Sequence, residues 1–432
     1  MPPQPPPKEA LSQAVAQTQG WALHHLKELV AHPSVLGAER GAQEYVAGLY
    51  DGLGFEAKLL PVDVGRIKHL KGFSPVDWSY ENRPNAVGVH DVKTPAGRSL
   101  VFNGHIDVVS PEPLTLWRND PFSPLVVNEG GETWVQGRGA GDMKGGTISC
   151  LWALKALREM GLEPASAVIL QSPIEEECTG NGTLALLADG YTGEACLIPE
   201  PFDETVLCNQ VGVIWFQVRV LGKTTHVLSA GSGVNAIEKS WLVIQALREL
   251  EKEMNRPERI PEPWRGTENP LNLNIGVIGG GDWASTVAGE CVTRFRFALF
   301  PGESLLGLQR EIQNRVAAVA AADPWLRDFP PQVEYVGFQA EGCAFDPAGD
   351  FGQAVVRAHQ SWRGEAPQHL HATCTTDVRH FNLYYDTPAT CYGPKAQNIH
   401  GVDERVSLNS MRRVAEVVTS LVIDWCGVRK IG

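Results

Sequence analysis

The chain lacks several features that would set it apart from ordinary globular proteins. It has no run of about 18 uninterrupted apolar residues, the length that a membrane-spanning helix needs, so we expect no membrane span. Its nine cysteines are odd in number and include no Cys-x-x-Cys pair. A disulfide scaffold would use an even set in a short secreted chain, so we expect reduced thiols and a cytoplasmic location.

Positive charge is also scarce. Lys and Arg together number 37 against 50 Asp and Glu, and the formal net charge is -13. A surface this acidic repels nucleic acids and anionic membranes, so neither is an expected partner. A small anionic substrate stays compatible with this charge, because a metal or a few local Arg and Lys residues can override the global field.

The length of the chain indicates more than one compact unit. A chain of 432 residues is too long for a single core, which indicates two domains or one domain with a large insertion. The first ten residues, Met1 to Ala10, are rich in proline and lack an apolar run. They predict a flexible tail, residues 1–10, and not a signal peptide.

The order of the expected elements favours an insertion. A long helical pattern from Leu11 to about Ala31 opens residues 11–208, in which helices then alternate with short apolar strands. This alternation is typical of an α/β domain with a mostly parallel sheet flanked by helices. Residues 209–336 instead predict two helices and four strands, a small α+β unit, and the α/β pattern returns in residues 337–432.

Three of the expected strands run directly into polar residues. Ser99–Asn103 leads to His105, Ala165–Leu170 leads to a run of three glutamates, and Glu194–Ile198 leads to Glu200. Ligands of open α/β sheets bind just beyond the carboxyl ends of the strands. We therefore expect these side chains to meet at one rim of the sheet.

The first polar segments suit a metal site. His105 and Asp107 can supply a metal ligand and the carboxylate that orients it, although a loop His and a loop Asp without a shared role would look the same. Asp142 lies in the glycine-rich turn Gly137–Gly146, which lacks the patterns of phosphate-binding loops. The turn indicates a bridging carboxylate, with a generic glycine-rich turn as the alternative.

The remaining acidic residues strengthen this interpretation. Glu175, Glu176 and Glu177 repel one another unless cations neutralise them, and the apolar strand before them argues against a solvated acidic turn. Glu200 and His400 are weak signals alone. Together the set offers two His, one Asp and two or three Glu, which suits two divalent metal ions, most readily Zn²⁺, with Co²⁺ or Mn²⁺ as alternatives. Such a pair of ions shares a bridging carboxylate.

These motifs, in this order, resemble a known family of dimetal amidohydrolases. The family includes acetylornithine deacetylase, succinyl-diaminopimelate desuccinylase, aminoacylase and bacterial folate carboxypeptidase. The resemblance extends from about Trp21 to Val422 and includes the inserted residues 209–336. It implies a metal-binding catalytic domain, a lid and dimerisation domain, and a homodimer.

The resemblance also implies roles for the metal-site residues. His105 is expected to bind one metal with Asp107 orienting it, and Asp142 to bridge the two metals. The other expected ligands are Glu177, Glu200 and His400, with Glu404 as a further acid nearby.

The general base is expected to be Glu176, because Gly180 and Gly182 fix the register of the glutamate run. The spacing to Gly180 departs by one residue from some members of the family. Glu175 therefore stays open as an alternative base.

Three residues of the inserted segment match further positions of the family. His226, in Gly222-Lys-Thr-Thr-His226, is expected to reach the active site of the partner subunit and to stabilise the oxyanion. Asn274 and Arg296 are expected to bind the carboxylate of the substrate.

The reaction implied by the resemblance is hydrolysis of the amide bond of a small N-acyl amino acid or N-acyl amine. A dimetal dipeptidase or carboxypeptidase and an N-formyl-aminopyrimidine deformylase are alternatives, and a non-catalytic metal-binding dimer is a remote one. His369, His371 and His380 form a further histidine group without an acidic partner at a strand end, and Cys178 has no base spaced to activate it. We expect no direct role for these four residues.

Overall fold

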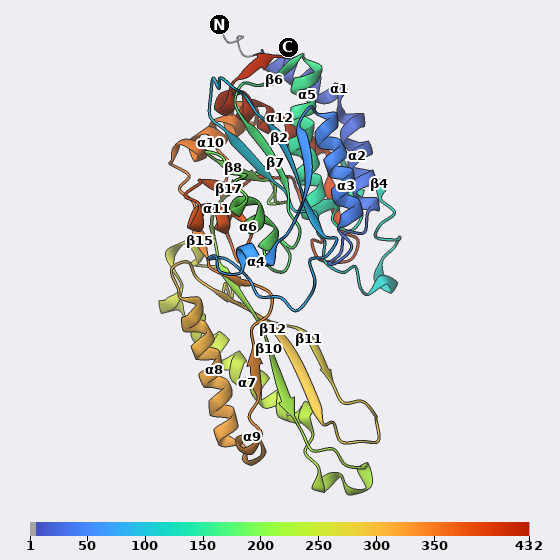
Figure 1. The fold of residues 1–432 in the computed structure, drawn as a ribbon, viewed down its shortest axis with the longest axis vertical. Helices are drawn as coiled ribbons and strands as arrows, with labels where there is room; N and C mark the ends of the chain where they lie inside the picture. The colour runs from blue at the N-terminus through green and yellow to red at the C-terminus, as the bar shows by residue number, and fades with distance from the viewer. Residues whose placement is uncertain (1–5, 432) are drawn as a thin grey trace.

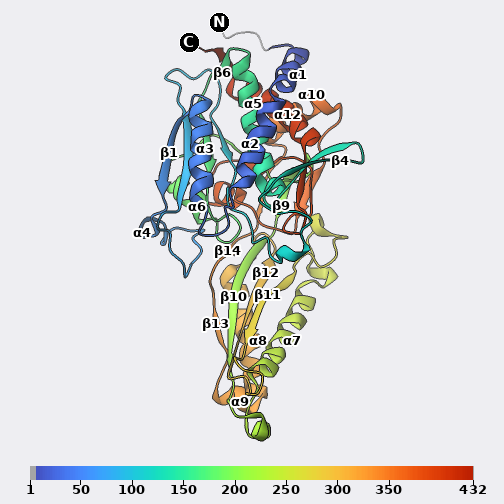
Figure 2. The same ribbon diagram turned by 90° about the vertical axis from the view of Figure 1, so that its right-hand side faces the viewer.

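The computed structural model describes residues 6–431, which form two parts along the long axis of the molecule (Figure 1). Residues 212–334 form an elongated distal unit, and the other described residues form the main body (Figure 2). Separate clusters of buried apolar side chains fill the two parts. No helix within residues 6–431 is long and apolar enough to cross a membrane.

A six-stranded sheet forms the centre of the main body. Its strands lie in the order β1 (Glu56–Pro61), β2 (Pro84–His90), β7 (Val168–Ser172), β3 (Leu100–Asn103), β8 (Cys196–Ile198) and β17 (Ala389–Cys391). The pairs β7–β3, β3–β8 and β8–β17 are parallel, whereas β1 and β2 are antiparallel additions at one edge. The expected mostly parallel sheet is therefore confirmed.

Helices pack around this sheet and on one another through apolar stripes. In the last of them, Met411, Val414, Val418 and Leu421 are buried at helical spacing. The helices of the main body are α1 (Lys8–Gln17), α2 (Gln19–Ala31), α3 (Arg40–Gly52), α4 (Val64–Ile67), α5 (Gly146–Glu159), α6 (Asn181–Ala188), α10 (Asp350–Arg363), α11 (Val378–Tyr384) and α12 (Leu408–Cys426).

The structure of the amino-terminal segment corrects two expectations. The single helix expected from Leu11 to Ala31 is two helices that meet at Thr18, whose hydroxyl donates to the carbonyls of Ala14 and Val15. The indole of Trp152 also donates to the Val15 carbonyl and so competes with the helical hydrogen bonds. Of the expected flexible tail, residues 1–5 lie outside the described residues, and residues 8–10 are helical.

Smaller sheets surround the central one. Their strands are β9 (Val206–Gln210) with β15 (Cys343–Ala344) and β16 (His369–Ala372), β4 (Leu125–Glu129) with β5 (Glu132–Gln136), β19 (Arg405–Ser407) and β18 (Ala396–Gln397), and β6 (Leu162–Pro164) with β20 (Val428–Lys430). The pairing of β19 with β5 places the segment before residue 405 beside the glycine-rich turn that follows β5.

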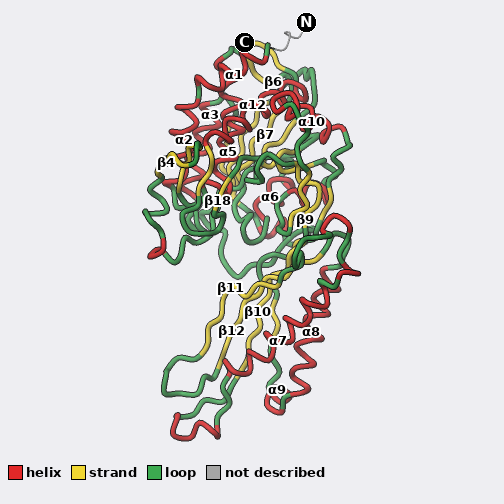
Figure 3. Tube along the Cα trace, turned by 180° about the vertical axis from the view of Figure 1, so that it is seen from behind, coloured by secondary structure: helices red, strands yellow, loops and turns green. Residues whose placement is uncertain are grey.

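The distal unit is an antiparallel sheet with two long helices on one face (Figure 3). Its strands lie in the order β11 (Leu273–Gly280), β12 (Glu290–Leu299), β10 (Gly212–Leu221) and β13 (Gln332–Glu334), and β14 (Gln339–Ala340) also pairs with β10. The helices are α7 (Ala236–Met254) and α8 (Leu305–Ala322), with the short α9 (Pro324–Asp328) at the far end. Two long helices and four strands agree with the expected α+β unit.

Two chain crossings connect the distal unit to the main body. The first is Val211, between β9 and β10, and the second is the segment 335–338. In the second crossing Gly337 has a positive φ of 82°, and its backbone N–H donates to the carbonyl of Pro75 at 2.8 Å. A glycine is favoured there because side chains rarely adopt this conformation, and a Cβ would also meet the ring of Trp215 at 2.6 Å.

Candidate active site

All five expected metal ligands converge at one rim of the main sheet. His105 follows β3, Glu177 follows β7 and Glu200 follows β8, and these three strands are neighbours in the sheet. Donor atoms of His105, Asp142 and Glu177 all lie within 4.8 Å of one another, as do those of His105, Glu176 and Glu200. The carboxyl ends of parallel strands meet at one edge, which brings residues 105 to 200 together.

The carboxylate of Asp142 lies between the two histidines. Its Oδ1 is 3.1 Å from His105 Nε2, and its Oδ2 is 3.4 Å from His400 Nε2. His400 Nε2 is also 3.0 Å from Glu177 Oε2, and His105 Nε2 is 3.9 Å from Glu200 Oε1. The arrangement has two halves that share one carboxylate, which is the geometry that a bridged metal pair requires.

Asp107 holds the site in two ways. Its backbone carbonyl accepts a hydrogen bond from His105 Nδ1 at 2.9 Å, because a carbonyl oxygen can only accept. Nδ1 therefore carries a proton, and Nε2 is the ring nitrogen that faces the carboxylates. The Asp107 carboxylate accepts from the backbone N–H groups of Glu176 and Glu177 at 3.2 and 3.1 Å. The Asp107 carboxylate therefore anchors the loop that carries Glu176 and Glu177. The sequence had predicted only its role of orienting His105.

The three adjacent glutamates have different surroundings. The buried carboxylate of Glu175 accepts from four neighbours and points away from the cluster; the donors are Trp78, Tyr80, Arg83 and Thr179, at 2.6, 2.5, 2.6 and 2.9 Å. Glu176 Oε2 is 3.9 Å from His105 Nε2, and its buried Oε1 has no hydrogen-bond partner within residues 6–431. Of these three glutamates, Glu176 is the one that the described residues leave with a free carboxylate oxygen beside His105.

The charge balance of the site favours cations. Burial raises the pKa of the Glu176 and Glu200 carboxyls well above the ordinary value, and nearby carboxylates raise it further. Burial opposes charge on His105, yet Asp142 and its acidic neighbours raise the pKa of this imidazole well above the ordinary range. Glu177 and Asp142 raise the pKa of His400 to about 11 despite burial. Protons offset the crowded negative charge here, and divalent cations would replace them.

The glycine-rich turn is held by two charged residues. Glu404 accepts from the backbone N–H groups of Gly139, Gly141 and Asp142 at 3.1, 2.9 and 2.9 Å and pairs with Arg138. Lys144 is buried, and its Nζ donates to the carbonyls of Leu29 and His32 at the end of α2. Sequence reasoning missed Arg138 and Lys144, although charged residues inside a glycine-rich turn were a usable signal.

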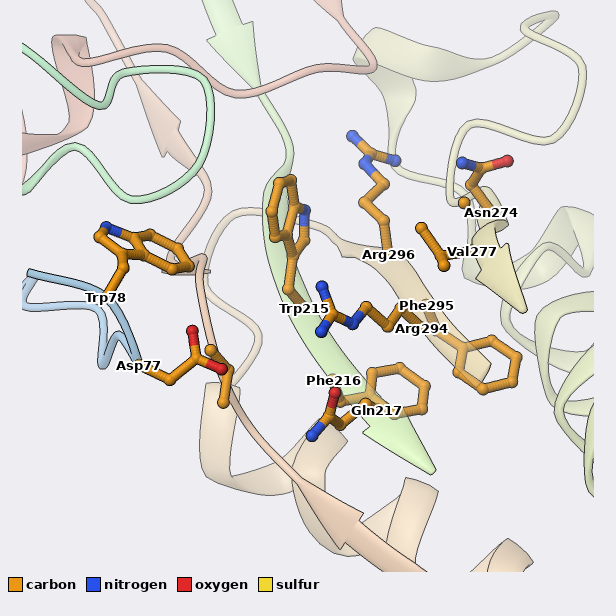
Figure 4. A pocket seen from close by; sticks show the side chains of 12 residues that line it. Asp77, Trp78, Trp215, Phe216, Gln217, Asn274, Val277, Arg294, Phe295 and Arg296 are labelled. Atoms are coloured by element: carbon orange, nitrogen blue, oxygen red, sulfur yellow. The ribbon is translucent and has the colours of Figure 1, made fainter. Parts of the chain in front are cut away.

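The residues expected from the inserted segment lie apart from the cluster. His226 comes after the end of β10 that is remote from the main body. Asn274 and Arg296 are register partners on β11 and β12 and line a pocket at the near end of the distal sheet (Figure 4). The Arg296 guanidinium is already engaged, because it donates to the Asn272 side chain and to the Thr373 carbonyl.

The four residues without an expected role lie outside the metal cluster. His369 and His371 lie on β16, where His371 contacts Asn209 at 2.9 Å. Burial lowers the pKa of His380 well below the ordinary value, which keeps its ring neutral. Burial raises the pKa of the Cys178 thiol, which disfavours a thiolate nucleophile.

Comparison with known proteins gives consistent matches over most of the chain. Residues 101–424 match peptidase family M20/M25/M40. The N-formyl-4-amino-5-aminomethyl-2-methylpyrimidine deformylase of Bacillus subtilis is 30% identical over 414 residues, which cover 90% of each chain. The succinyl-diaminopimelate desuccinylase of a Methylobacterium species is 30% identical over 409 residues, 90% of this chain and 92% of that one.

A solved structure confirms the fold. A di-peptidase of Saccharomyces cerevisiae superposes with a TM-score of 0.79 at 14% identity, over 96% of this chain and 98% of the other. The family match covers most of the chain, and the metal-site motifs lie within its bounds. The chain therefore belongs to peptidase family M20/M25/M40 and is an enzyme that hydrolyses amide bonds.

Proposed function

We propose that this enzyme uses two metal ions to remove a small acyl group from an amino acid or another amine. The observation that carries the proposal is the position of the Asp142 carboxylate, with one oxygen toward each of His105 and His400. Hydrolysis adds the hydroxyl of water to the acyl carbon and a proton to the amine, and the amide C–N bond breaks. Both curated relatives named above bear the names of enzymes that act on small N-acyl compounds.

The residues present fit two divalent ions. We assign His105, Asp142 and Glu200 to one metal, and Asp142, Glu177 and His400 to the other, because these groups face one another across the shared carboxylate. Imidazole and carboxylate donors without thiolates suit Zn²⁺, with Co²⁺ or Mn²⁺ as substitutes. Such ions, when bound, polarise the amide carbonyl and make water reactive at neutral pH.

Glu176 is our proposed general base and acid. Its free Oε1 and its buried position suit it to take a proton from the attacking water and to pass it to the leaving amine. The four hydrogen bonds to Glu175 leave that carboxylate no free role, which supports Glu176 over the alternative register.

His226 is proposed to act on the partner subunit. Strand β10 spans ten residues, about 30 Å, and separates His226 from the metal cluster of its own chain. His226 Nδ1 accepts from the Leu228 N–H at 3.0 Å, so Nε2 carries a proton and can donate to an oxyanion. This donor would complete an active site that one chain leaves incomplete.

Exposed apolar side chains support a homodimer built through the distal unit. Ile237 and Trp241 on α7 are 42% and 58% exposed, and Val277 and Ile278 on β11 are 54% and 52% exposed. Strand β11 is also an edge of its sheet and offers free backbone groups for pairing. We propose that two copies join here about a two-fold axis, with residues 209–336 as the lid and dimerisation domain.

We also propose that the enzyme is located in the cytoplasm. All nine cysteines lie within residues 6–431 and are free thiols, which agrees with a reducing compartment.

An activity panel tests the function. Protein reconstituted with Zn²⁺ or Co²⁺ is assayed on N-acetylornithine, N-succinyl-diaminopimelate, N-formyl amines and dipeptides, with and without a chelator. We expect chelator-sensitive release of an acyl group. Preference for dipeptides would move the enzyme to the exopeptidase alternative, and absence of all turnover with two metals verified as bound would contradict the proposal.

A further inference from the structure

The loop that carries the proposed base Glu176 is a closed turn. The backbone N–H of Thr179 donates to the carbonyl of Glu175 at 2.9 Å, and the N–H of the following glycine donates to the same carbonyl at 2.7 Å. Glu176 and Glu177 lie between the two ends of this turn, so a shift of Thr179 also shifts them. On the metal side, the carboxylate of Asp107 holds the turn through two of its N–H groups.

Two buried side chains hold the other side of this turn at a single atom. The Ser74 hydroxyl donates to the carbonyl oxygen of Thr179 at 3.1 Å, and Arg379 Nη2 donates to the same oxygen at 2.7 Å. A carbonyl oxygen has two lone pairs, so these two donors saturate it. All three residues are fully buried, and a donor that is lost here leaves the carbonyl poorly satisfied.

Both donors also contact the second chain crossing and the strand β14 that continues it. The backbone N–H of Gln339 donates to the hydroxyl oxygen of Ser74 at 3.1 Å. The guanidinium of Arg379 lies over the ring of Phe338, 5.4 Å from the centre of the ring. The crossing is therefore connected to the Thr179 carbonyl by two separate routes.

The crossing in turn follows the distal sheet. The carbonyl of Phe338 accepts from the Trp215 N–H on β10 at 2.8 Å, and the Gln339 side chain donates to the Trp215 carbonyl at 3.0 Å. A change in the direction in which β10 leaves the main body therefore moves Phe338 and Gln339 as well.

Ser74 itself is fixed to the main body. Its backbone N–H donates to the side-chain oxygen of Asn181 at 3.0 Å, and its carbonyl accepts from the amide nitrogen of the same side chain at 2.8 Å. Because this backbone is held at the start of α6, the hydroxyl is the part that can respond to the crossing. A hydroxyl that accepts from Gln339 and donates to Thr179 strengthens both bonds, so loss of one weakens the other.

We propose that Ser74 is a positioning residue that links the placement of the distal unit to the loop of the base. When β10 changes direction, Gln339 moves, the bond from Ser74 to Thr179 weakens, and Glu176 leaves the position from which it transfers a proton. The rate then depends on the orientation of the distal unit as well as on the metal site. The inference rests on the proposed function, because it acts through the proposed base.

Ser74→Ala removes this link, and Ser166→Ala is the matched control. Ser166 is also fully buried, and its hydroxyl accepts from the Gly97 N–H at 2.8 Å, but it precedes β7 at the end of that strand opposite the metal rim. On the best acyl substrate of the activity panel, Ser74→Ala should lower kcat by about 5- to 30-fold, because two buried hydrogen bonds are lost. KM should stay nearly unchanged, and the control should change neither constant.

Hydrogen exchange measured by mass spectrometry gives a readout that needs no turnover. In Ser74→Ala, exchange should become faster in two separate peptides, residues 175–182 and residues 335–340, because each loses a bond to the hydroxyl. Exchange in the buried helix α12 should stay as in the wild type, whereas a general loss of stability would raise it there too. Ser166→Ala should leave both peptides unchanged.

Phe338→Leu weakens the second route, because it removes the ring under Arg379. The double variant with Ser74→Ala should lose more activity than the product of the two single losses, since each single variant keeps one route. Losses that simply multiply would overturn the inference, because the effect of Ser74 would then not depend on the crossing.

Two further outcomes separate this inference from the proposed function. Wild-type kcat in Ser74→Ala, with wild-type exchange in residues 175–182, would overturn the inference and leave the proposed function standing. Absence of amide hydrolysis by the wild type would contradict the proposed function, and exchange in the two peptides would then decide alone whether the crossing and the loop are linked.

Discussion

Two neighbouring glutamates illustrate how surroundings, and not residue type, assign roles in this site. Glu175 is neutralised by Arg83 and held by three further donors, so it acts as a structural anchor. Glu176 is buried with an unpartnered oxygen, and burial raises its pKa. The same carboxyl group is thus available for proton transfer at one position and unavailable at the next.

Glu176→Gln should remove turnover and leave metal binding intact. The amide keeps the shape of the carboxyl but cannot accept a proton, and loss of a general base typically costs about 10²- to 10⁴-fold in rate. The measurements are kcat and the metal content of the purified variant. Full activity in this variant would remove Glu176 from the proposed role.

Glu175→Gln should instead act on stability. Arg83 keeps Glu39 as a partner, so we expect a loss of about 1–3 kcal/mol in the free energy of unfolding, from the weakened buried hydrogen bonds. Urea unfolding measures it, with exposed Glu44→Gln as a control. A variant that is fully stable and has no turnover would return Glu175 to consideration as the base.

At the scale of elements, the turn between β5 and α5 is a preorganised support for Asp142. Glu404 fixes three of its backbone N–H groups, and Lys144 ties it to the end of α2. These contacts set the position of the bridging carboxylate before any ligand binds, which lowers the cost of assembling the site.

Glu404→Gln should weaken metal binding without touching a metal ligand. The neutral amide cannot accept from all three N–H groups and pair with Arg138, so the turn should loosen. We expect about a 10- to 100-fold loss in affinity, as for other residues that support metal ligands. Competition with a chelator measures it, and an affinity equal to the wild type would show that the turn is rigid without Glu404.

The sequence predicted the elements whose signals are local. The three strands that end in polar residues and the apolar stripe of α12 could be found because period and composition mark them. The break at Thr18 was missed, because it depends on Trp152, more than a hundred residues away. The pocket at Trp78 and Trp215 was also out of reach, since it forms only when distant segments meet.

At the scale of the whole molecule, we propose that one chain contributes to two active sites. It supplies the metal cluster of one site and the histidine of the other. The metal cluster lies in the main body, and His226 lies at the remote end of the distal unit. In the proposed dimer each cluster receives the histidine of the other subunit. Activity then depends on pairing, and not only on folding.

Complementation between inactive variants tests this arrangement. His226→Ala and Glu176→Gln should each have little activity, but a mixture refolded in equal amounts should recover about a quarter of the wild-type rate, because half of the dimers are mixed and each has one complete site. Steady-state rates of the mixture and of each variant alone provide the measurement. No recovery, with mixed dimers demonstrated by mass, would show that His226 does not act across the interface.

The length of β10 has a mechanical consequence. The strand begins beside the crossing at Gly337 and ends near His226, so a rotation of the distal unit at this crossing would displace its two ends unequally. A rotation of about 10° at the crossing would carry the far end by roughly 5 Å over a strand about 30 Å long. Trp215 sits close to the crossing, where the same rotation produces little displacement. Such a rotation would therefore leave the surroundings of Trp215 nearly unchanged while it moves His226 over a distance comparable to a side chain.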